Sequence, residues 1–102
     1  MSEQVFWILL GLSGHPRHGY ALSREVETIS SGRVRLTTGT LYGALRRLLE
    51  EAWIERVTQA DTSRDKQAYR LTAAGRMHLR HELRRLEHAT SAASLRLKRE
   101  AL

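Results

Sequence analysis

Apolar residues in the first half of the chain recur at the spacing of helices. Residues 3–13 are apolar nearly all round, which predicts a first helix that is covered on more than one side. A break near Pro16 ends this run, and apolar positions return at mostly helical spacing from about residue 18 to residue 29. Residues 38–51 place four leucines on one helical face. The pattern therefore predicts three helices joined by short loops.

The second half of the chain changes from strand alternation to one long helix. Residues 53–58 and 67–71 alternate and are rich in strand formers, and the polar segment 60–66 lies between them. This arrangement predicts a β-hairpin. Thr72 is a suitable N-cap for a helix that starts at residue 73 and meets no proline before the end of the sequence.

The order of three helices, two strands and a final helix is typical of a mainly α winged helix-turn-helix fold with a long C-terminal dimerisation helix. We expect residues 1–71 to form the DNA-binding domain. Residues 72–102 then form the dimerisation helix, which packs with the helix of residues 3–13.

Two features predict a homodimer. The first helix has more apolar surface than a chain of 102 residues can easily cover, and the last helix has apolar residues in the 4-3-4-3-4 spacing of a coiled-coil seam. The seam consists of Leu79, Leu83, Leu86, Thr90, Ala93 and Leu97. The residues expected at the subunit contact are Val5, Ile8, Leu9, Leu79, Leu83, Leu86, Ala93 and Leu97.

The third helix has the pattern of a DNA-recognition helix. Opposite its leucines lie glycines, which allow close approach, together with hydroxyl and basic side chains that can donate to phosphates or base edges. Helix capping is the simpler explanation for the threonines, but it does not explain the exposed polar side. The candidates on this helix are Thr37, Thr38, Gly39, Thr40, Tyr42, Gly43, Arg46 and Arg47. Tyr20 on the second helix, and Arg64 and Lys66 in the hairpin turn, are further candidates.

Charge supports a polyanionic partner but is unevenly placed. The net charge is +6, yet residues 1–69 hold nine Lys and Arg against eight Asp and Glu, whereas residues 70–102 hold eight against three. The basic excess therefore lies on the last helix and not on the recognition candidate. This leaves open an alternative function, a winged-helix module that binds an acidic protein without specific DNA binding.

Several function classes receive no support. The sequence has no cysteine, its five histidines have no convincing metal-ligand spacing, and no nucleophile elbow or phosphate loop is present. We therefore expect no catalytic residues, no metal and no cofactor. The apolar run of residues 5–12 is too short to cross a bilayer and follows an acidic start, which predicts a cytoplasmic protein without a membrane partner.

Short motifs across residues 5–76 resemble the PadR family of bacterial transcriptional regulators. They are Ile8-Leu9-Leu10-Gly11-Leu12, His18-Gly19-Tyr20, Gly39-Thr40-Leu41-Tyr42 followed by Ala44-Leu45 and Leu48, Glu50-Glu51 with Ile54, and Tyr69-Arg70-Leu71-Thr72-Ala73-Ala74-Gly75. The resemblance implies a cytoplasmic homodimer of the short subgroup that represses transcription at palindromic operators in double-stranded DNA. It also implies release by a small molecule or a stress signal.

Two further points follow from this resemblance. In some relatives flat aromatic compounds bind between the first and last helices, which makes Trp7 a possible ligand contact, although packing in the dimer core is the simpler role. Gly43 stands in place of the family's usual proline, and Ala52-Trp53 stands in place of Gly-Leu. Alanine disfavours a left-handed helix end at residue 52.

Overall fold

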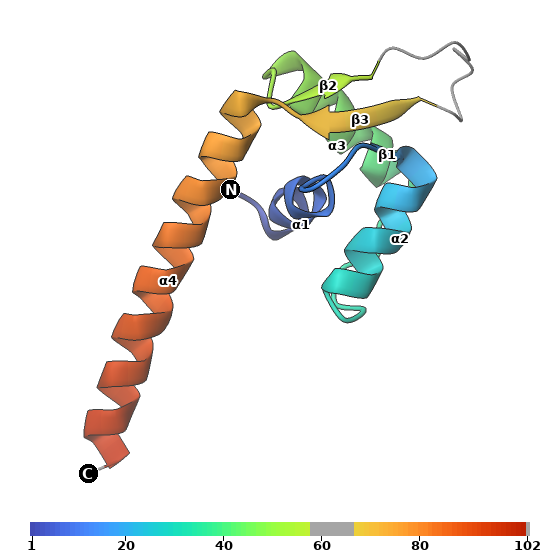
Figure 1. Ribbon diagram of the computed structural model, residues 1–102. Coiled ribbons are helices and arrows are strands. Elements are labelled where there is room, and N and C mark those ends of the chain that lie inside the picture. Colours follow the sequence, from blue (N-terminus) through green and yellow to red (C-terminus); the bar gives the residue numbers. More distant parts are fainter. Residues whose placement is uncertain (58–66, 102) are drawn as a thin grey trace.

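The computed structural model describes residues 1–57 and 67–101 and confirms the mainly α winged helix-turn-helix fold (Figure 1). Its elements in chain order are α1 (Glu3–Gly11), β1 (Arg17–His18), α2 (Gly19–Ile29), α3 (Thr38–Glu50), β2 (Ile54–Arg56), β3 (Ala68–Leu71) and α4 (Ala73–Ala101). The predicted helices and the two predicted strands are present, with slightly shorter bounds.

A strand that the sequence analysis missed completes the sheet. Within the described residues the sheet is antiparallel in the order β1-β3-β2, and Tyr69 of β3 lies opposite Arg17 on one side and Arg56 on the other. Strand β1 has only two residues, so it is too short to show alternation. It ties the start of α2 to the hairpin.

The core lies where α1 meets the sheet and the other helices. Figure 1 shows α1 between α2 and α4, below the sheet. Ile8 and Leu9 are 0% exposed and belong to this core. This corrects their assignment to a subunit contact, because neither has surface left for a partner. The other fully buried large side chains are Leu12, Leu22, Val26, Leu45, Leu48 and Ile54.

Helix α4 is attached to the turn between α3 and β2. The Thr72 hydroxyl accepts a hydrogen bond from the Gly75 amide at 3.0 Å and donates to the Ala52 carbonyl at 2.6 Å, so the helix cap also fastens the helix to the winged domain. Ala52 has φ +60°, so the left-handed helix end is present despite the alanine.

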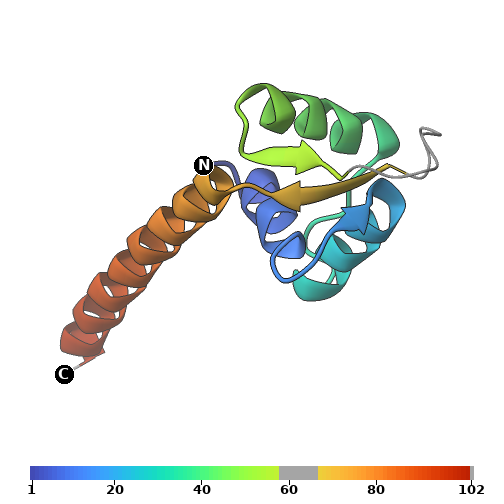
Figure 2. The same ribbon diagram turned by 45° about the horizontal axis from the view of Figure 1, so that its top comes forward.

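After this attachment α4 packs beside α1 as far as Leu86 and then projects away from the rest of the chain, as both overall views show (Figures 1 and 2). The molecule measures 61 × 27 × 21 Å, and every described α4 residue after Leu86 is exposed. Within the described residues, no helix combines the length and the apolar character needed to cross a membrane.

Candidate nucleic-acid interface

Helix α3 lies on the outer side of the winged domain (Figure 2). Leu41, Leu45 and Leu48 are buried. Thr37 is the N-cap, and its hydroxyl accepts from the Thr40 amide at 3.2 Å and donates to the Thr40 hydroxyl at 2.9 Å. Seven of the candidates named from the sequence are exposed on this element: Thr37, Thr38, Gly39, Thr40, Gly43, Arg46 and Arg47.

The two candidate glycines of α3 lie against open space. A β-carbon built on Gly39 or on Gly43 meets no protein atom within 4 Å. Gly43 lies in the interior of α3, where glycine costs about 1 kcal/mol relative to alanine. Among the described residues, no neighbouring atom requires a glycine at either position.

Tyr42 differs from the other α3 candidates because it is half-buried and packs on α2. A β-carbon on Gly19 would lie 2.7 Å from the Tyr42 hydroxyl oxygen, so the glycine is needed for this close contact. The His-Gly-Tyr motif and the Gly-Thr-Leu-Tyr motif therefore meet in space. Part of the role of Tyr42 is to fix α3 against α2.

Tyr20 is strongly exposed, at 72% of its surface, and lies near the same end of α3. The guanidinium carbon of Arg24 lies 5.8 Å from the centre of its ring. Tyr20 and Tyr42, together with Ser23, Leu36, Thr38 and Leu41, line a hollow of about 470 Å³ between α2 and α3. The structure thus brings the α2 and α3 candidates together on one surface.

Five of the described arginines form ion pairs, and others, Arg46 and Arg47 among them, do not. Ion pairs join Arg17 to Glu25, Arg33 to Glu3, Arg35 to Glu27, Arg70 to Glu55 and Arg85 to Glu82. In the part of the chain that the structure describes, Arg46 and Arg47 have no ion-pair partner. Their guanidinium groups are available to an external anion.

The hairpin candidates Arg64 and Lys66 lie outside the described residues. On the described strands, Arg56 donates to the Gln67 side chain at 3.1 Å, and Arg70 pairs across the hairpin with Glu55 at 2.8 Å.

The dimerisation candidates on α4 differ in how much surface they offer. Leu83 is 47% exposed and Leu97 is 65% exposed, and Ala93 is also exposed. Leu86 on α4 and Val5 on α1 are half-buried. Leu79 is 8% exposed and mostly packs in its own protomer, so it contributes little to any subunit contact.

Trp7 lies at a second hollow, between α1 and α4. This hollow has a volume of about 300 Å³, and its other lining residues include Phe6, Glu82, Arg85 and Leu86. The Trp7 and Phe6 rings are 5.4 Å apart and nearly perpendicular.

Glu82 in the same hollow was not singled out from the sequence. It is buried and accepts two hydrogen bonds from Arg85, at 2.7 and 3.0 Å. These bonds hold the pKa of Glu82 below its ordinary value.

Among the five histidines, His78 has a ring contact: it stacks on Trp53 at a ring separation of 4.2 Å and an angle of 19°. Among the described residues, no cluster of three or more His, Asp or Glu side chains is placed to hold a metal ion.

The profile of the transcriptional regulator PadR-like family matches residues 8–81. A PadR family transcription regulator from Clostridium difficile is 19% identical, with a TM-score of 0.77, and the match covers 94% of this chain and 99% of that one. A PadR-like regulator from Bacillus cereus is 22% identical, with a TM-score of 0.75, and the match covers 92% and 90%.

A third similar structure is that of Bacillus subtilis PadR, which was crystallised in complex with operator DNA. It is 24% identical, with a TM-score of 0.69, and the match covers 81% of this chain and 48% of that longer one. No curated protein matches the sequence.

Proposed function

Because the chain belongs to the PadR-like family of transcriptional regulators, we propose that it is a sequence-specific repressor that binds operator DNA as a homodimer. The observation that carries the proposal is the outer surface of α3. It combines exposed threonines, two glycines against open space and two arginines without an ion pair among the described residues. A major groove about 12 Å wide accepts a helix of this kind.

The first part of α3 reads the bases in this proposal. Gly39 and Gly43 allow the helix backbone to approach the groove, while Thr38 and Thr40 donate to base edges or phosphates. Arg46 and Arg47 contact the phosphates. Glu50 near the end of the helix repels them, so contact is confined to the N-terminal turns.

The exposed leucines of α4 support the dimer. Two copies joined by a two-fold axis present two α3 helices, and such a pair binds half-sites of a palindromic operator about one helical turn apart. The hollow beside Trp7 supports release by a small aromatic effector, which would stack on the indole. The site of action is the cytoplasm.

The glycines allow a test in which stability and affinity move in opposite directions. Gly43→Ala meets no protein atom within 4 Å, so the variant should be as stable as the parent or up to about 1 kcal/mol more stable. Its methyl group lies between α3 and the DNA, so operator affinity should fall by about tenfold or more, since misplacing a base contact costs about 1–3 kcal/mol. Thermal unfolding and fluorescence anisotropy at fixed salt measure the two effects. Retained affinity would refute the recognition surface.

The arginines provide a second test that separates DNA from a protein partner. Arg46→Gln should reduce the slope of log affinity against log salt by about 0.9 if Arg46 contacts one phosphate. Arg96→Gln is the matched control, because Arg96 is exposed on the far part of α4 and the charge change is the same. If the parent protein and its variants bind DNA only weakly, and their affinity does not depend on salt, the result would favour the alternative function. In that alternative the winged-helix module binds an acidic protein, which the low net charge of residues 1–69 permits.

A further inference from the structure

An ion pair connects the start of α1 to the loop between α2 and α3. The carboxylate of Glu3 binds the guanidinium group of Arg33, which is 30 residues away in the sequence, and Arg33 Nη2 donates to the second carboxylate oxygen at 3.4 Å. The Trp7 indole N–H, one turn further along α1, donates to Glu3 Oε1 at 3.5 Å. The largest cause of the lowered pKa of Glu3 is its hydrogen bond from Arg33.

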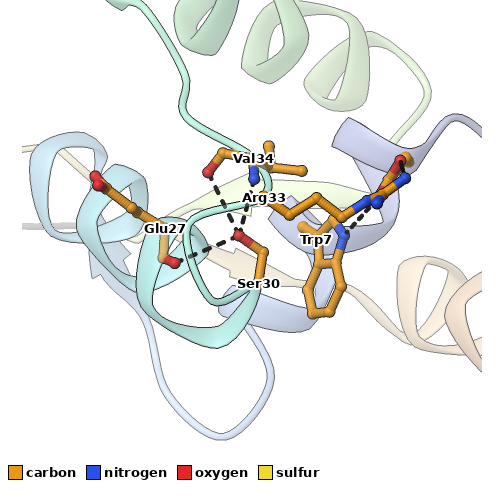
Figure 3. A network of polar contacts seen from close by, with 6 residues as sticks. Trp7, Glu27, Ser30, Arg33 and Val34 are labelled. Atoms are coloured by element: carbon orange, nitrogen blue, oxygen red, sulfur yellow. Dashed lines mark hydrogen bonds and ion pairs between the residues drawn. The ribbon is translucent and has the colours of Figure 1, made fainter.

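The loop on the other side of this contact has no helix or strand between Ile29 and Thr38. Figure 3 shows how it is held: the Ser30 hydroxyl turns back toward Val34, whose amide donates to it at 3.0 Å. Ser30 and Val34 are buried, at 6% and 7% exposure. The loop between α2 and α3 is therefore anchored in the core by Ser30 and Val34, on α1 by Arg33, and on α2 by the ion pair of Arg35 with Glu27.

This loop leads directly into α3, because its last residue, Thr37, is the N-cap of that helix. At this end of α3 the contact with α2 runs through Tyr42 and Gly19, and a hollow of about 470 Å³ lies beside it. The loop, with its anchors, is the covalent connection that sets where the first turn of α3 lies.

We propose that Glu3 and Arg33 are positioning residues for the recognition helix. Their ion pair fixes the α2–α3 loop on α1 and so places the first turn of α3 for operator binding. This inference rests on the proposed function. It concerns residues that touch no DNA, because in this arrangement the Arg33 charge is bound by Glu3 and not by a phosphate.

The direction in which one substitution changes operator affinity separates this role from an electrostatic one. Glu3→Gln removes a carboxylate and so raises the net charge of the chain by one unit. If Arg33 contacted DNA, or if net charge alone mattered, the substitution would free a guanidinium group or increase attraction, and affinity would rise. A positioning role predicts the opposite, since the loop loses its contact with α1.

The first experiment uses the full chain and a duplex selected by the parent protein from a random pool. Anisotropy titrations at fixed salt compare the parent with Glu3→Gln, Arg33→Gln, both together, and the exchanged pair Glu3→Arg with Arg33→Glu. Each single variant should bind about three to ten times more weakly, the range expected when two copies each lose an exposed ion pair. The double variant should bind no more weakly than either single one, and the exchanged pair should recover most of the loss.

Glu87→Gln is the matched control. Glu87 is exposed on α4, and in the described part of the chain it has no ion-pair partner, so its substitution adds the same charge without breaking a contact. It should leave affinity unchanged or raise it slightly. A rise for Glu3→Gln equal to that of Glu87→Gln would overturn the proposal, as would a loss that the exchanged pair does not restore.

A second measurement decides the question without DNA. Amide hydrogen exchange of residues 33–41 should be at least about threefold faster in Glu3→Gln and Arg33→Gln, because local opening becomes easier, and should return toward the parent rate in the exchanged pair. Unchanged exchange would overturn the positioning role. A parent protein that selects no duplex would instead refute the proposed function, and the exchange rates would still decide whether the ion pair holds the loop.

Discussion

Gly75 is the position where the structure makes the sharpest prediction about stability. It lies in the first turn of α4, and a β-carbon built on it would be 2.0 Å from the backbone carbonyl oxygen of Trp53. The same carbonyl accepts a hydrogen bond from the Thr72 amide at 3.1 Å. Because the obstacle is backbone, no side-chain rotation relieves the clash, and Gly75→Ala must move α4 away from the turn before β2.

The size of the effect follows from this geometry. An ordinary contact at 3.4 Å requires a displacement of roughly 1.4 Å, and overpacking of this kind costs about 1–3 kcal/mol. The displacement also weakens the bond from the Thr72 hydroxyl to Ala52, at about 1 kcal/mol. The higher helix propensity of alanine returns about 1 kcal/mol. We expect a net loss of about 1–3 kcal/mol, or a fall in Tm of about 4–8 °C for each kcal/mol.

The predicted fall in Tm is measured by thermal unfolding, with circular dichroism as the signal. All variants are compared at one protein concentration, because the Tm of a dimer depends on concentration. Gly39→Ala is the matched control, since its added methyl group meets no protein atom within 4 Å and it should not lower Tm. A Gly75→Ala protein as stable as Gly39→Ala would refute the attachment of α4 described here.

Three further predictions concern other contacts. Ser30→Ala removes the buried acceptor of a backbone amide and should lower the free energy of unfolding by about 1–3 kcal/mol in urea titrations, with the m-value unchanged. Leu83→Glu with Leu86→Glu should produce monomers in sedimentation equilibrium, and an unchanged mass would exclude the α4 seam. Glu82 has a lowered pKa because Arg85 binds its carboxylate, so its contribution to stability is present above the ordinary pKa of 4.5 and is lost as the pH falls through the lower folded value. Glu82→Gln should therefore be less stable than the parent at pH 7, and the difference should disappear on acidification; a difference independent of pH would contradict this role.

The sequence was sufficient for the elements that are long and periodic. The leucines of α3 and the uninterrupted α4 follow the helical period over many residues, so the existence of both helices and the inward face of α3 could be predicted. Strand β1 could not, because two residues carry no period. Ala52 adopts φ +60° against its own preference, since its carbonyl and that of Trp53 are both held by Thr72.

Periodicity says that a face is apolar but not what covers it. The apolar first helix predicts that a partner subunit covers Ile8 and Leu9, yet the core of the same protomer covers both completely. The pair of Glu3 and Arg33 was equally hidden, because two charged residues 30 positions apart have no sequence signal that links them. Contacts of this kind depend on how the loops close.

The glycines of the chain show how burial distinguishes packing from recognition. Gly19 and Gly75 are buried, and a β-carbon at either would strike a neighbour, so the protomer's own packing explains why they are glycine. Gly39 and Gly43 are exposed, and a β-carbon at either meets none of the described residues, although glycine at the interior position 43 costs about 1 kcal/mol relative to alanine. Within the described residues, no packing contact of the folded chain explains why these two positions are glycine. The surface on which both glycines lie also carries the threonines, together with Arg46 and Arg47, which have no ion pair among the described residues, and this agrees with the recognition role proposed for α3.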